Sequence, residues 1–203
     1  RTAIVVPAFN EESTIASQVS ALAKIGDVVV VNDGSTDRTQ KICQDIKCRI
    51  INFTNNVGYE SAVEAGIRSC FNYDFVITTD ADGEIPIESV IEAKKKLNAG
   101  AECVLGIRDS FPRFAESFVN SFFWRRFRVK DIFCGLKGYK IDQIDSEFSL
   151  SGSVGAGLAI AMLREKKRIS TVSVRVKPRE GESRFGKNDI KTNFRILRVL
   201  IHV

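Results

Sequence analysis

Histidine is almost missing from this chain of 203 residues, and the only one, His202, lies one residue from the C-terminus. A histidine-based catalytic triad or a histidine-ligated metal site is therefore excluded from the body of the fold. The five cysteines are odd in number and scattered, and no two of them form a Cys-x-x-Cys pair. We expect reduced thiols in a cytosolic setting and no zinc site.

Long apolar runs and glycine-rich phosphate loops are also missing. No apolar run reaches about 18 residues, so we predict neither a signal peptide nor a membrane-spanning helix within this sequence. Neither G-x-G-x-x-G nor G-x-x-x-x-G-K-[ST] occurs, which argues against a dinucleotide-binding fold and a P-loop. The chain starts at Arg1 without a methionine. We therefore expect a trimmed sequence, and a membrane segment beyond Val203 stays open.

Charge is unevenly distributed along the chain. The net charge is +5, but residues 164–198 carry twelve basic and four acidic side chains, a balance of +8. The rest of the chain is therefore net acidic. A basic C-terminal third indicates an anionic partner, such as a phosphate, a nucleic acid or a membrane surface.

The pattern of apolar segments predicts an α/β fold. Apolar, β-branched runs at 3–7, 27–32, 49–53, 75–79 and 101–106 are typical of strands buried on both faces, and segments with helical spacing separate them. Four strand–helix units in succession predict a doubly wound, mostly parallel sheet with right-handed crossovers. The length and the 44% hydrophobic content suit one globular domain.

Acidic side chains follow the strand predicted at 75–79. Asp80 and Asp82 come directly after it and are followed by Gly83 and Glu84. Strand alternation points Asp80 and Asp82 to the same side, at the carboxyl edge of the sheet, where open α/β sheets bind ligands. Two or three hard oxygen ligands there suit Mg²⁺ or Mn²⁺ shared with substrate phosphates. The alternative is a solvated acidic turn before the helix that begins near Pro86.

Three earlier loops should reach the same edge. Residues 10–12, 33–35 and 56–58 each follow a predicted strand, so with 80–82 they are expected to line one cleft. An acidic cleft that binds a nucleotide diphosphate needs a metal ion to offset the charge.

The second half of the chain is less regular, with a short strand predicted at 134–139, a helix at 153–166 and a strand at 169–176. Residues 111–130 mix seven aromatic side chains with arginines. This mixture fits nucleic-acid binding, a helix at a lipid interface, or a helix whose aromatics pack on the sheet. All three alternatives stay open.

Residues 190–203 have helical spacing with two faces. Ile190, Phe194, Leu197 and Ile201 share one face, and Lys191, Arg195, Arg198 and His202 share another. A basic amphipathic helix is typical of membrane-surface binding. The alternative is a terminal helix docked on the core. We expect a catalytic domain over 1–189 and a separate surface helix over 190–203.

Seven motifs occur in one order along nearly the whole chain. They are Val5-Val6-Pro7-Ala8-Phe9-Asn10-Glu11-Glu12, Val30-Val31-Asn32-Asp33-Gly34-Ser35-Thr36-Asp37, Asn56-x-Gly58, Asp80-Ala81-Asp82, Gly106-x-Arg108, Asp131-x-x-Cys134-Gly135 and Arg179-Glu180-Gly181-Glu182-Ser183-Arg184. Together they resemble the family 2 glycosyltransferases, and the last one favours the dolichol- and polyprenyl-phosphate sugar synthases. The resemblance implies a nucleotide-diphospho-sugar transferase fold: a GT-A-like, Rossmann-like, mostly parallel sheet flanked by helices.

The resemblance also implies roles for individual residues. The base and ribose of the nucleotide would contact Pro7, Phe9, Glu11, Val31 and Asp33. The sugar diphosphate would contact Asp80, Ala81 and Asp82, and the metal, Mg²⁺ or Mn²⁺, would be held by Asp82 and Glu84. Phosphates would be bound by Arg108, Arg179 and Arg184, whose guanidinium groups suit bidentate recognition. Asp80, Asp82, Asp131 and Arg108 are the expected catalytic residues.

The chain departs from the family pattern at several positions. Gly83 and Glu84 stand where the family often has Leu-Gln, and Tyr59 and Glu60 stand where it has Lys-Gly. The helix before the last strand lacks the acids that are frequent in the family, since 158–161 reads Leu-Ala-Ile-Ala. These differences leave the donor sugar and the acceptor open.

The predicted reaction transfers a sugar from a GDP- or UDP-sugar to a polyprenyl or dolichyl phosphate, with inversion. A phosphate acceptor is already an anion at neutral pH and needs no strong base. A hydroxyl acceptor would need one, and Asp131 is the first candidate. We expect a peripheral protein on the cytoplasmic face of a membrane, with an anionic lipid surface as partner, no nucleic-acid partner, and a role in protein glycosylation or the cell envelope.

Two alternatives remain at this point. One is a family 2 transferase that acts on a polysaccharide or a soluble glycan. The other is a non-catalytic, nucleotide-sugar-binding membrane scaffold.

Overall fold

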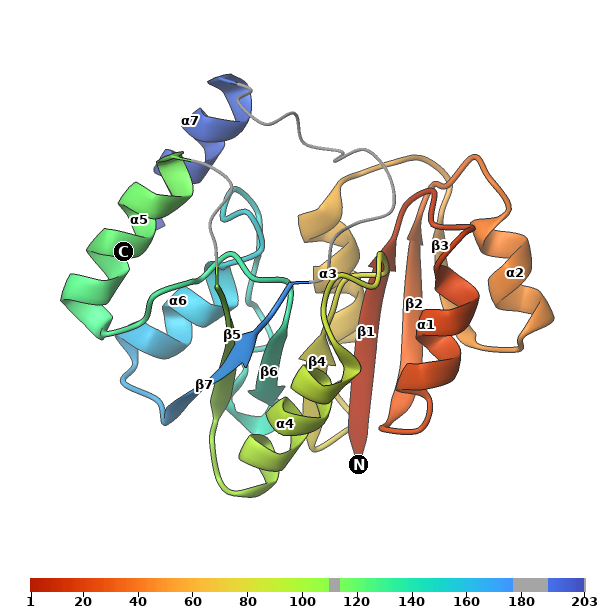
Figure 1. Ribbon diagram of the computed structural model, residues 1–203, viewed down its shortest axis with the longest axis horizontal. Helices are drawn as coiled ribbons and strands as arrows, with labels where there is room; N and C mark the ends of the chain where they lie inside the picture. The colour runs from red at the N-terminus through yellow and green to blue at the C-terminus, as the bar shows by residue number, and fades with distance from the viewer. Residues whose placement is uncertain (110–113, 177–189, 203) are drawn as a thin grey trace.

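The computed structural model describes residues 1–109, 114–176 and 190–202 and shows a seven-stranded sheet with helices on both faces (Figure 1). The strands are β1 (Thr2–Ala8), β2 (Asp27–Asp33), β3 (Arg49–Phe53), β4 (Phe75–Thr78), β5 (Cys103–Arg108), β6 (Lys137–Lys140) and β7 (Ile169–Val174). The helices are α1 (Ile15–Leu22), α2 (Thr39–Asp45), α3 (Tyr59–Arg68), α4 (Ile87–Asn98), α5 (Phe114–Phe127), α6 (Gly157–Arg164) and α7 (Ile190–Arg198). Two short 3₁₀ helices cover Ile141–Gln143 and Val199–His202.

The strand order is β3-β2-β1-β4-β6-β5-β7. β6 is antiparallel to both of its neighbours, β4 and β5, and every other pair of neighbours is parallel. The predicted mostly parallel α/β sheet is therefore confirmed. Because β6 runs the other way, it begins at the edge where the parallel strands end. The residues just before Lys137 are thereby brought to the same edge as the loops after β1, β2 and β4.

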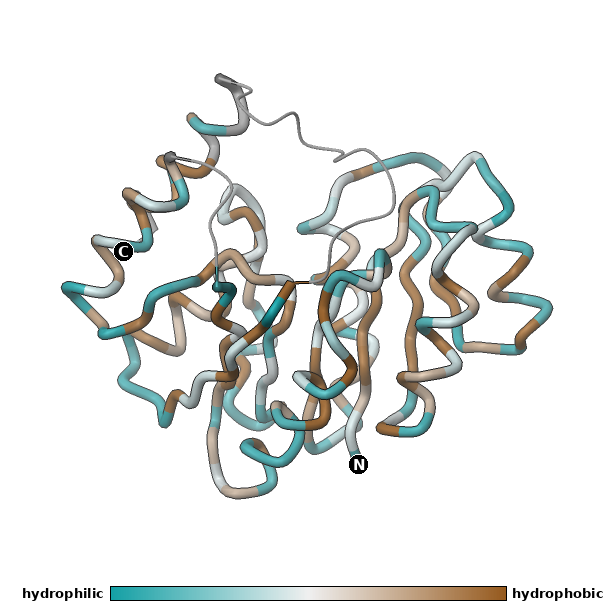
Figure 2. Tube along the Cα trace, in the orientation of Figure 1, coloured by the Kyte–Doolittle hydropathy of each residue, from teal (hydrophilic) through white to brown (hydrophobic). Residues whose placement is uncertain are grey.

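Two hydrophobic cores lie on opposite faces of the sheet. Strand residues such as Val5, Val29 and Val76 point into a core covered by α3, α5, α6 and α7. Their neighbours Ile4 and Val28 point into a core covered by α1, α2 and α4. A strand buried on both faces has no polar alternation, which explains the continuous apolar runs. Figure 2 shows these strands as the most hydrophobic segments.

Small residues let α3 lie close to the sheet. A Cβ atom on Gly66 would lie 2.3 Å from Cγ1 of Val5, a separation that side chains cannot adopt. Gly66 therefore allows this helix to pack closely on β1. α3 carries Tyr59 at its first position, so this contact also fixes where the N-terminus of the helix meets the carboxyl edge.

Three segments differ from the sequence prediction. The strand predicted at 134–139 covers only Lys137–Lys140, and the helix predicted at 153–166 begins at Gly157. Gly152, Val154 and Gly155 all have positive φ, so the backbone before Gly157 forms turns that cannot continue a helix. The helix predicted over 190–203 is α-helical to Arg198 and then 3₁₀.

Helix α7 packs on the core through residues outside the apolar face described above, and part of that face is exposed. Ile196 and Val199 are buried in the core, whereas Phe194 is 71% exposed and Leu197 is 41% exposed. Helix α5, which lies beside α7 (Figure 1), divides its aromatics in the same way. Phe123 is fully buried, whereas other aromatic side chains are exposed: Phe118, Phe122 and Trp124. None of the helices within the described residues is both long and apolar enough to span a bilayer.

Candidate active site

The carboxyl edge of the sheet collects the polar motifs. The parallel strands end there at Ala8, Asp33, Thr78 and Arg108. The antiparallel β6 adds the segment that precedes it, because the Thr78 hydroxyl donates a hydrogen bond of 2.8 Å to the carbonyl oxygen of Gly135. Side chains from motifs far apart in sequence therefore meet at one edge, as the sequence predicts for four of them.

Asp80 lies at the centre of this edge, between two elements. On one side, a Cβ atom on Gly135 would lie 2.1 Å from Oδ2 of Asp80, so only glycine fits there. On the other side lies Tyr59, the first residue of α3, where burial and the charge of Asp80 raise the pKa of the Tyr59 hydroxyl. Burial and the negative charge of Asp82 raise the pKa of Asp80 to about 6. Negative charge is thus crowded at the end of β4.

The acidic turn continues from Asp80 to Glu84. Ala81 is buried, and the Asp82 carboxylate accepts a hydrogen bond of 3.1 Å from the backbone N–H of Glu84. Gly83 has a φ of 78°, which favours glycine at this position. Among the residues that the structure describes, no three His, Cys, Asp or Glu side chains are grouped to hold a metal ion. The carboxylate oxygens of Asp82 and Glu84 nevertheless suit a hard divalent cation, whose positive charge would also offset the negative charge of the neighbouring Asp80.

Arg108 ends β5 in a buried ion network. Its guanidinium group makes two hydrogen bonds to Asp131, from Nε to Oδ2 at 2.8 Å and from Nη2 to Oδ1 at 3.1 Å. Nη2 also donates to Oε2 of Glu116 on α5 at 2.9 Å. Asp131 is fully buried and Glu116 is 2% exposed. Despite burial, the two carboxylates raise the pKa of Arg108, so it remains charged.

The chain also matches a known protein family. Residues 3–144 match the model of a protein family described as Glycosyl transferase family 2. The chain belongs to this family. It is a glycosyltransferase, and the predicted family resemblance is confirmed.

Two curated relatives of this glycosyltransferase are informative. The chain is 29% identical over 196 residues to a dolichyl-phosphate hexose transferase of Haloferax volcanii, covering 90% of this chain and 85% of that protein. It is 32% identical over 120 residues to a bactoprenol glucosyl transferase of Shigella phage SfV. That match covers 53% of this chain and 39% of the phage protein.

A solved structure shares the fold of this glycosyltransferase. Glucosyl-3-phosphoglycerate synthase from Mycobacterium tuberculosis, in complex with Mn²⁺, UDP and glucosyl-3-phosphoglycerate, superposes with a TM-score of 0.72. The match covers 99% of this chain and 77% of that chain, at 18% sequence identity. At this identity the likeness is one of fold, and it confirms the GT-A-like architecture.

The expected base- and ribose-binding residues of the glycosyltransferase lie on β1, β2 and the loops after them. Pro7 and Val31 are paired in neighbouring strands and are both buried. Phe9 is half-buried. Glu11 is 5% exposed, and its carboxylate accepts a hydrogen bond of 3.1 Å from the Thr14 hydroxyl.

Asp33 organises the neighbouring loop. Its Oδ1 accepts a hydrogen bond of 2.8 Å from the N–H of Val57, and its Oδ2 accepts one of 2.9 Å from the N–H of Gly58. Asp33 is 4% exposed. The carboxylate therefore shapes the loop that leads into α3, a role that sequence reasoning did not assign to it.

Sequence reasoning missed three further residues at this edge of the glycosyltransferase: Tyr59, Glu116 and Lys137. Lys137 is 4% exposed, and its Nζ donates a hydrogen bond of 2.6 Å to the carbonyl oxygen of Cys134. Burial lowers the pKa of Lys137, whereas nearby acidic groups, including Asp131 and Asp80, raise it. The sequence did contain a signal for Lys137, because a lysine within a predicted short strand is unusual. No local signal pointed to Glu116.

Two expected phosphate-binding residues lie outside the described part of the chain: Arg179 and Arg184.

Burial raises the pKa of Cys134 to about 12, so this thiol is protonated at neutral pH and is no nucleophile.

Proposed function

We propose that this glycosyltransferase moves a sugar, a hexose, from a GDP- or UDP-sugar to a polyprenyl or dolichyl phosphate, with inversion. One observation carries the proposal: Asp80, Asp82 and Glu84 follow β4 at an edge where Gly135 and the network of Arg108 also lie. The relatives named for dolichyl phosphate and bactoprenol support a lipid-phosphate acceptor.

A divalent cation, Mg²⁺ or Mn²⁺, fits the acidic turn. Asp82 and Glu84 would hold it, and Asp80 and Ala81 would contact the sugar diphosphate. When bound, such an ion supplies positive charge that stabilises the leaving diphosphate. The raised pKa of Asp80 supports this assignment, because burial and the charge of Asp82 disfavour its ionised form, and a bound cation would offset that negative charge.

The base and ribose would bind between the ends of β1 and β2, against Pro7, Phe9, Glu11, Val31 and Asp33. Both oxygens of Asp33 already accept one backbone hydrogen bond each, but a carboxylate oxygen can accept a second. Asp33 would therefore accept hydrogen bonds from the loop backbone and from the nucleotide at the same time.

The ion network bears on the choice of acceptor. Asp131 is fully buried, and its carboxylate is bound by Arg108 and by the N–H of Phe133 at 3.0 Å. Such a carboxylate is poorly suited to take a proton from a hydroxyl acceptor. A phosphate monoester is already deprotonated near neutral pH, so it needs no base. Within the network Asp131 would orient Arg108, which would face a phosphate together with Arg179 and Arg184.

The acceptor's lipid tail requires that the enzyme approach a bilayer. The exposed side chains Phe118, Phe122, Trp124, Phe194 and Leu197 lie on α5 and α7, and we call them the α5–α7 surface. Basic residues accompany it: Arg125, Arg126, Arg128, Lys130 and Arg198, all exposed. Aromatic side chains beside basic ones suit the interface of an anionic leaflet. We infer that residues 190–203 act as a membrane-surface element beside a catalytic unit over 1–189, on the cytoplasmic face of a membrane.

The deciding experiment is a donor and acceptor screen. Purified protein with Mn²⁺ or Mg²⁺ is given GDP- and UDP-hexoses, together with a short polyprenyl phosphate or with 3-phosphoglycerate, and the products are read by mass. A polyprenyl-phosphate sugar is the expected product. A glycosylated soluble acceptor alone would redirect the assignment, and no turnover of any donor would favour the non-catalytic scaffold.

Vesicle co-sedimentation tests the membrane part of the proposal. Truncation before α7 is unsuitable, because Ile196 and Val199 are buried. The variant Phe194→Ser/Leu197→Ser changes only exposed positions, and Ile91→Ser, at an exposed position on α4, is the control. The double variant should lose binding to anionic vesicles while the control keeps it. Equal binding of all three proteins would contradict the interfacial role.

A further inference from the structure

The end of helix α2 brings two cysteines together. The N–H of Cys48 donates a hydrogen bond of 3.2 Å to the carbonyl oxygen of Cys43, and the N–H of Lys47 donates one of 3.0 Å to that of Gln44. Lys47 has a φ of 55°, in the left-handed region. These two hydrogen bonds around a left-handed residue make a Schellman motif. Cys43 is the third residue from the end of the helix, and Cys48 follows the left-handed residue.

The side chains of Cys43 and Cys48 lie on the same apolar core. Cys43 is fully buried in it, and Cys48 packs against it. In a Schellman motif the residues at these two positions commonly pack against each other. Standard bond lengths on either side of the 3.2 Å hydrogen bond keep the two Cα atoms within about 7 Å of each other. A disulfide joins Cα atoms that are about 4.4–6.8 Å apart, so this helix end can hold one.

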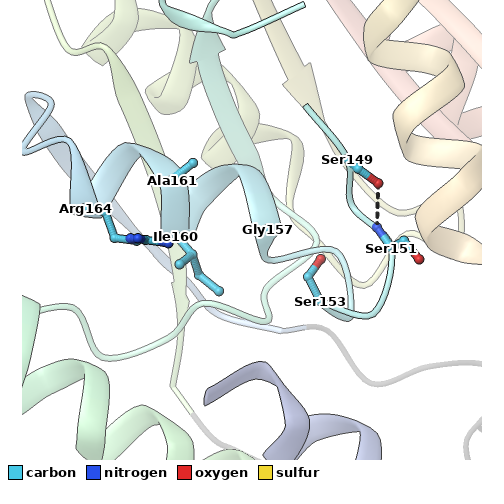
Figure 3. Close-up of a pocket in the computed structure, with 7 residues that line it drawn as sticks. All are labelled: Ser149, Ser151, Ser153, Gly157, Ile160, Ala161 and Arg164. Atoms are coloured by element: carbon cyan, nitrogen blue, oxygen red, sulfur yellow. Dashed lines mark hydrogen bonds between the residues drawn. The ribbon is translucent and has the colours of Figure 1, made fainter. Parts of the chain in front are cut away.

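Cys48 is the member of the pair that solvent reaches. Its side chain is half-buried, whereas the other four cysteines are buried: Cys43, Cys70, Cys103 and Cys134. The cavity of about 270 Å³ beside α6 is lined by serine side chains and one face of that helix, and none of the residues drawn in Figure 3 is a cysteine. The neighbouring Cys43 thiol also lowers the pKa of Cys48, which favours the nucleophilic thiolate. A dissolved oxidant therefore meets Cys48 first.

A disulfide at this position would join α2 to the edge of the sheet. Cys48 directly precedes Arg49, the first residue of β3, and β3 is the outermost strand on its side of the sheet. An outermost strand has a hydrogen-bonded neighbour on one side only, so it opens more easily than a central strand. A covalent link to α2 would hold the beginning of β3 in place.

We propose that Cys43 and Cys48 form a peroxide-sensitive thiol pair, which closes a reversible disulfide between α2 and β3. The thiolate of Cys48 attacks one oxygen of hydrogen peroxide, the O–O bond breaks, and Cys48 becomes a sulfenic acid. The hydroxide that leaves takes up the proton lost by the Cys48 thiol. The sulfur of Cys43 then attacks the Cys48 sulfur, the S–O bond breaks, and the hydroxyl group leaves as water with the Cys43 proton. In total, two thiols are oxidised by two electrons and one peroxide is reduced to two molecules of water.

The test treats the native, reduced protein with hydrogen peroxide, alkylates the thiols that remain and reads the products by mass. Two of the five thiols should be lost, and dithiothreitol should restore both. Trypsin cleaves after Lys41, Lys47 and Arg49. The disulfide should therefore appear as the peptide 42–47 joined to the peptide 48–49, which separate when the bond is reduced.

Two variants distinguish this pair from the other thiols. Cys48→Ser should keep its four remaining thiols under the same treatment, because the accessible member of the pair is missing. Cys70→Ser is the matched control, since it removes a buried cysteine in the core on the opposite face of the sheet. It should still lose two thiols.

Two changes at Lys47 test whether the helix end places the pair. Lys47 is exposed, so its side chain can be replaced without changing the core. Lys47→Gly keeps the positive φ, and its disulfide should form as in the wild type. Lys47→Pro fixes a negative φ and removes the N–H that bonds to Gln44. Its disulfide should form more slowly, with circular dichroism showing that both variants are folded.

The contrary results are equally specific. Peroxide that leaves all five thiols free, or that converts Cys48 to a sulfinic acid or a link between two chains while Cys43 stays free, would overturn the pair. Loss of two thiols from Cys48→Ser would assign the reaction to other cysteines. Equal rates of disulfide formation in folded Lys47→Pro and Lys47→Gly would contradict the placement of the pair by the helix end.

Discussion

Replacing Asp80 with asparagine should make the protein more stable and inactive at the same time. Burial and the charge of Asp82 raise the pKa of Asp80 from 3.8 to about 6. The folded state therefore disfavours the ionised carboxylate that exists near neutral pH. Asparagine has nearly the same shape as aspartate and no charge. Asp80→Asn should thus remove a cost in free energy without removing a contact.

The magnitude follows from the shift in pKa. A rise of about two units corresponds to about 3 kcal/mol at most, at roughly 1.4 kcal/mol per unit. Asp80 is partly exposed to solvent, so we expect a gain of about 1–3 kcal/mol. For a chain of this length that is a rise of roughly 2–12 °C in Tm.

The pH dependence of stability tests the sign of this effect. Because the folded-state pKa lies above the unfolded-state value, the stability of the wild-type protein falls between about pH 4 and pH 6 through this group and levels off above. Asp80→Asn lacks that fall. The difference in the free energy of unfolding between the variant and the wild type should therefore increase as the pH rises from about 4 to about 6. Urea denaturation of metal-free protein between pH 4.5 and 8 measures it, with Asp45→Asn, an exposed change on α2, as the control. A variant less stable than wild type at pH 8, or a gap that does not change with pH, would refute the reasoning.

Three further changes have defined outcomes. Asp82→Asn should lower turnover by about 100-fold or more, the scale of one lost transition-state contact, and unchanged turnover with saturating Mn²⁺ would argue against the metal assignment. Gly135→Ala should displace the Asp80 carboxylate, since the new Cβ would lie 2.1 Å from its Oδ2; calorimetry should then show weaker nucleotide binding, and wild-type affinity would contradict the contact. Asp131→Asn should cost about 3–5 kcal/mol in urea denaturation by breaking a buried ion pair, and a wild-type midpoint would mean that Glu116 alone satisfies Arg108.

Much of the fold could be predicted from the sequence because its signals are local. Strands buried on both faces must be apolar throughout, so the runs at 3–7 and 27–32 mark their own positions. A parallel strand must return through a crossover, so every loop after such a strand reaches the same edge. Asp33 and Asp80 could therefore be placed at one edge without coordinates.

The partners of the site residues could not be predicted in the same way. Arg108 and Asp131 are 23 residues apart, and they meet because β6 inserts antiparallel between β4 and β5. Nothing in the four residues Lys137–Lys140 indicates that direction, since a strand this short carries no pattern that distinguishes parallel from antiparallel pairing. Glu116 joins the same network only because α5 lies against this edge.

Helix α7 illustrates the same limit. Its helical spacing was evident, but the spacing alone did not say which face would be covered. Ile196 and Val199 are buried, while Phe194 stays exposed. The choice depends on the surface that α5 presents, which no local pattern contains.

The sequence by itself determined the order of strands and helices along the chain, the acidic turn and the edge at which it lies, because these follow from periodicity and chain direction. Only the tertiary structure decided what each acidic group contacts: Asp131 with Arg108, Asp33 with the loop at Gly58, and Asp80 with Gly135. The physical reason is that a carboxylate's role depends on the charges, donors and solvent around it. Those surroundings come from segments far away in the sequence.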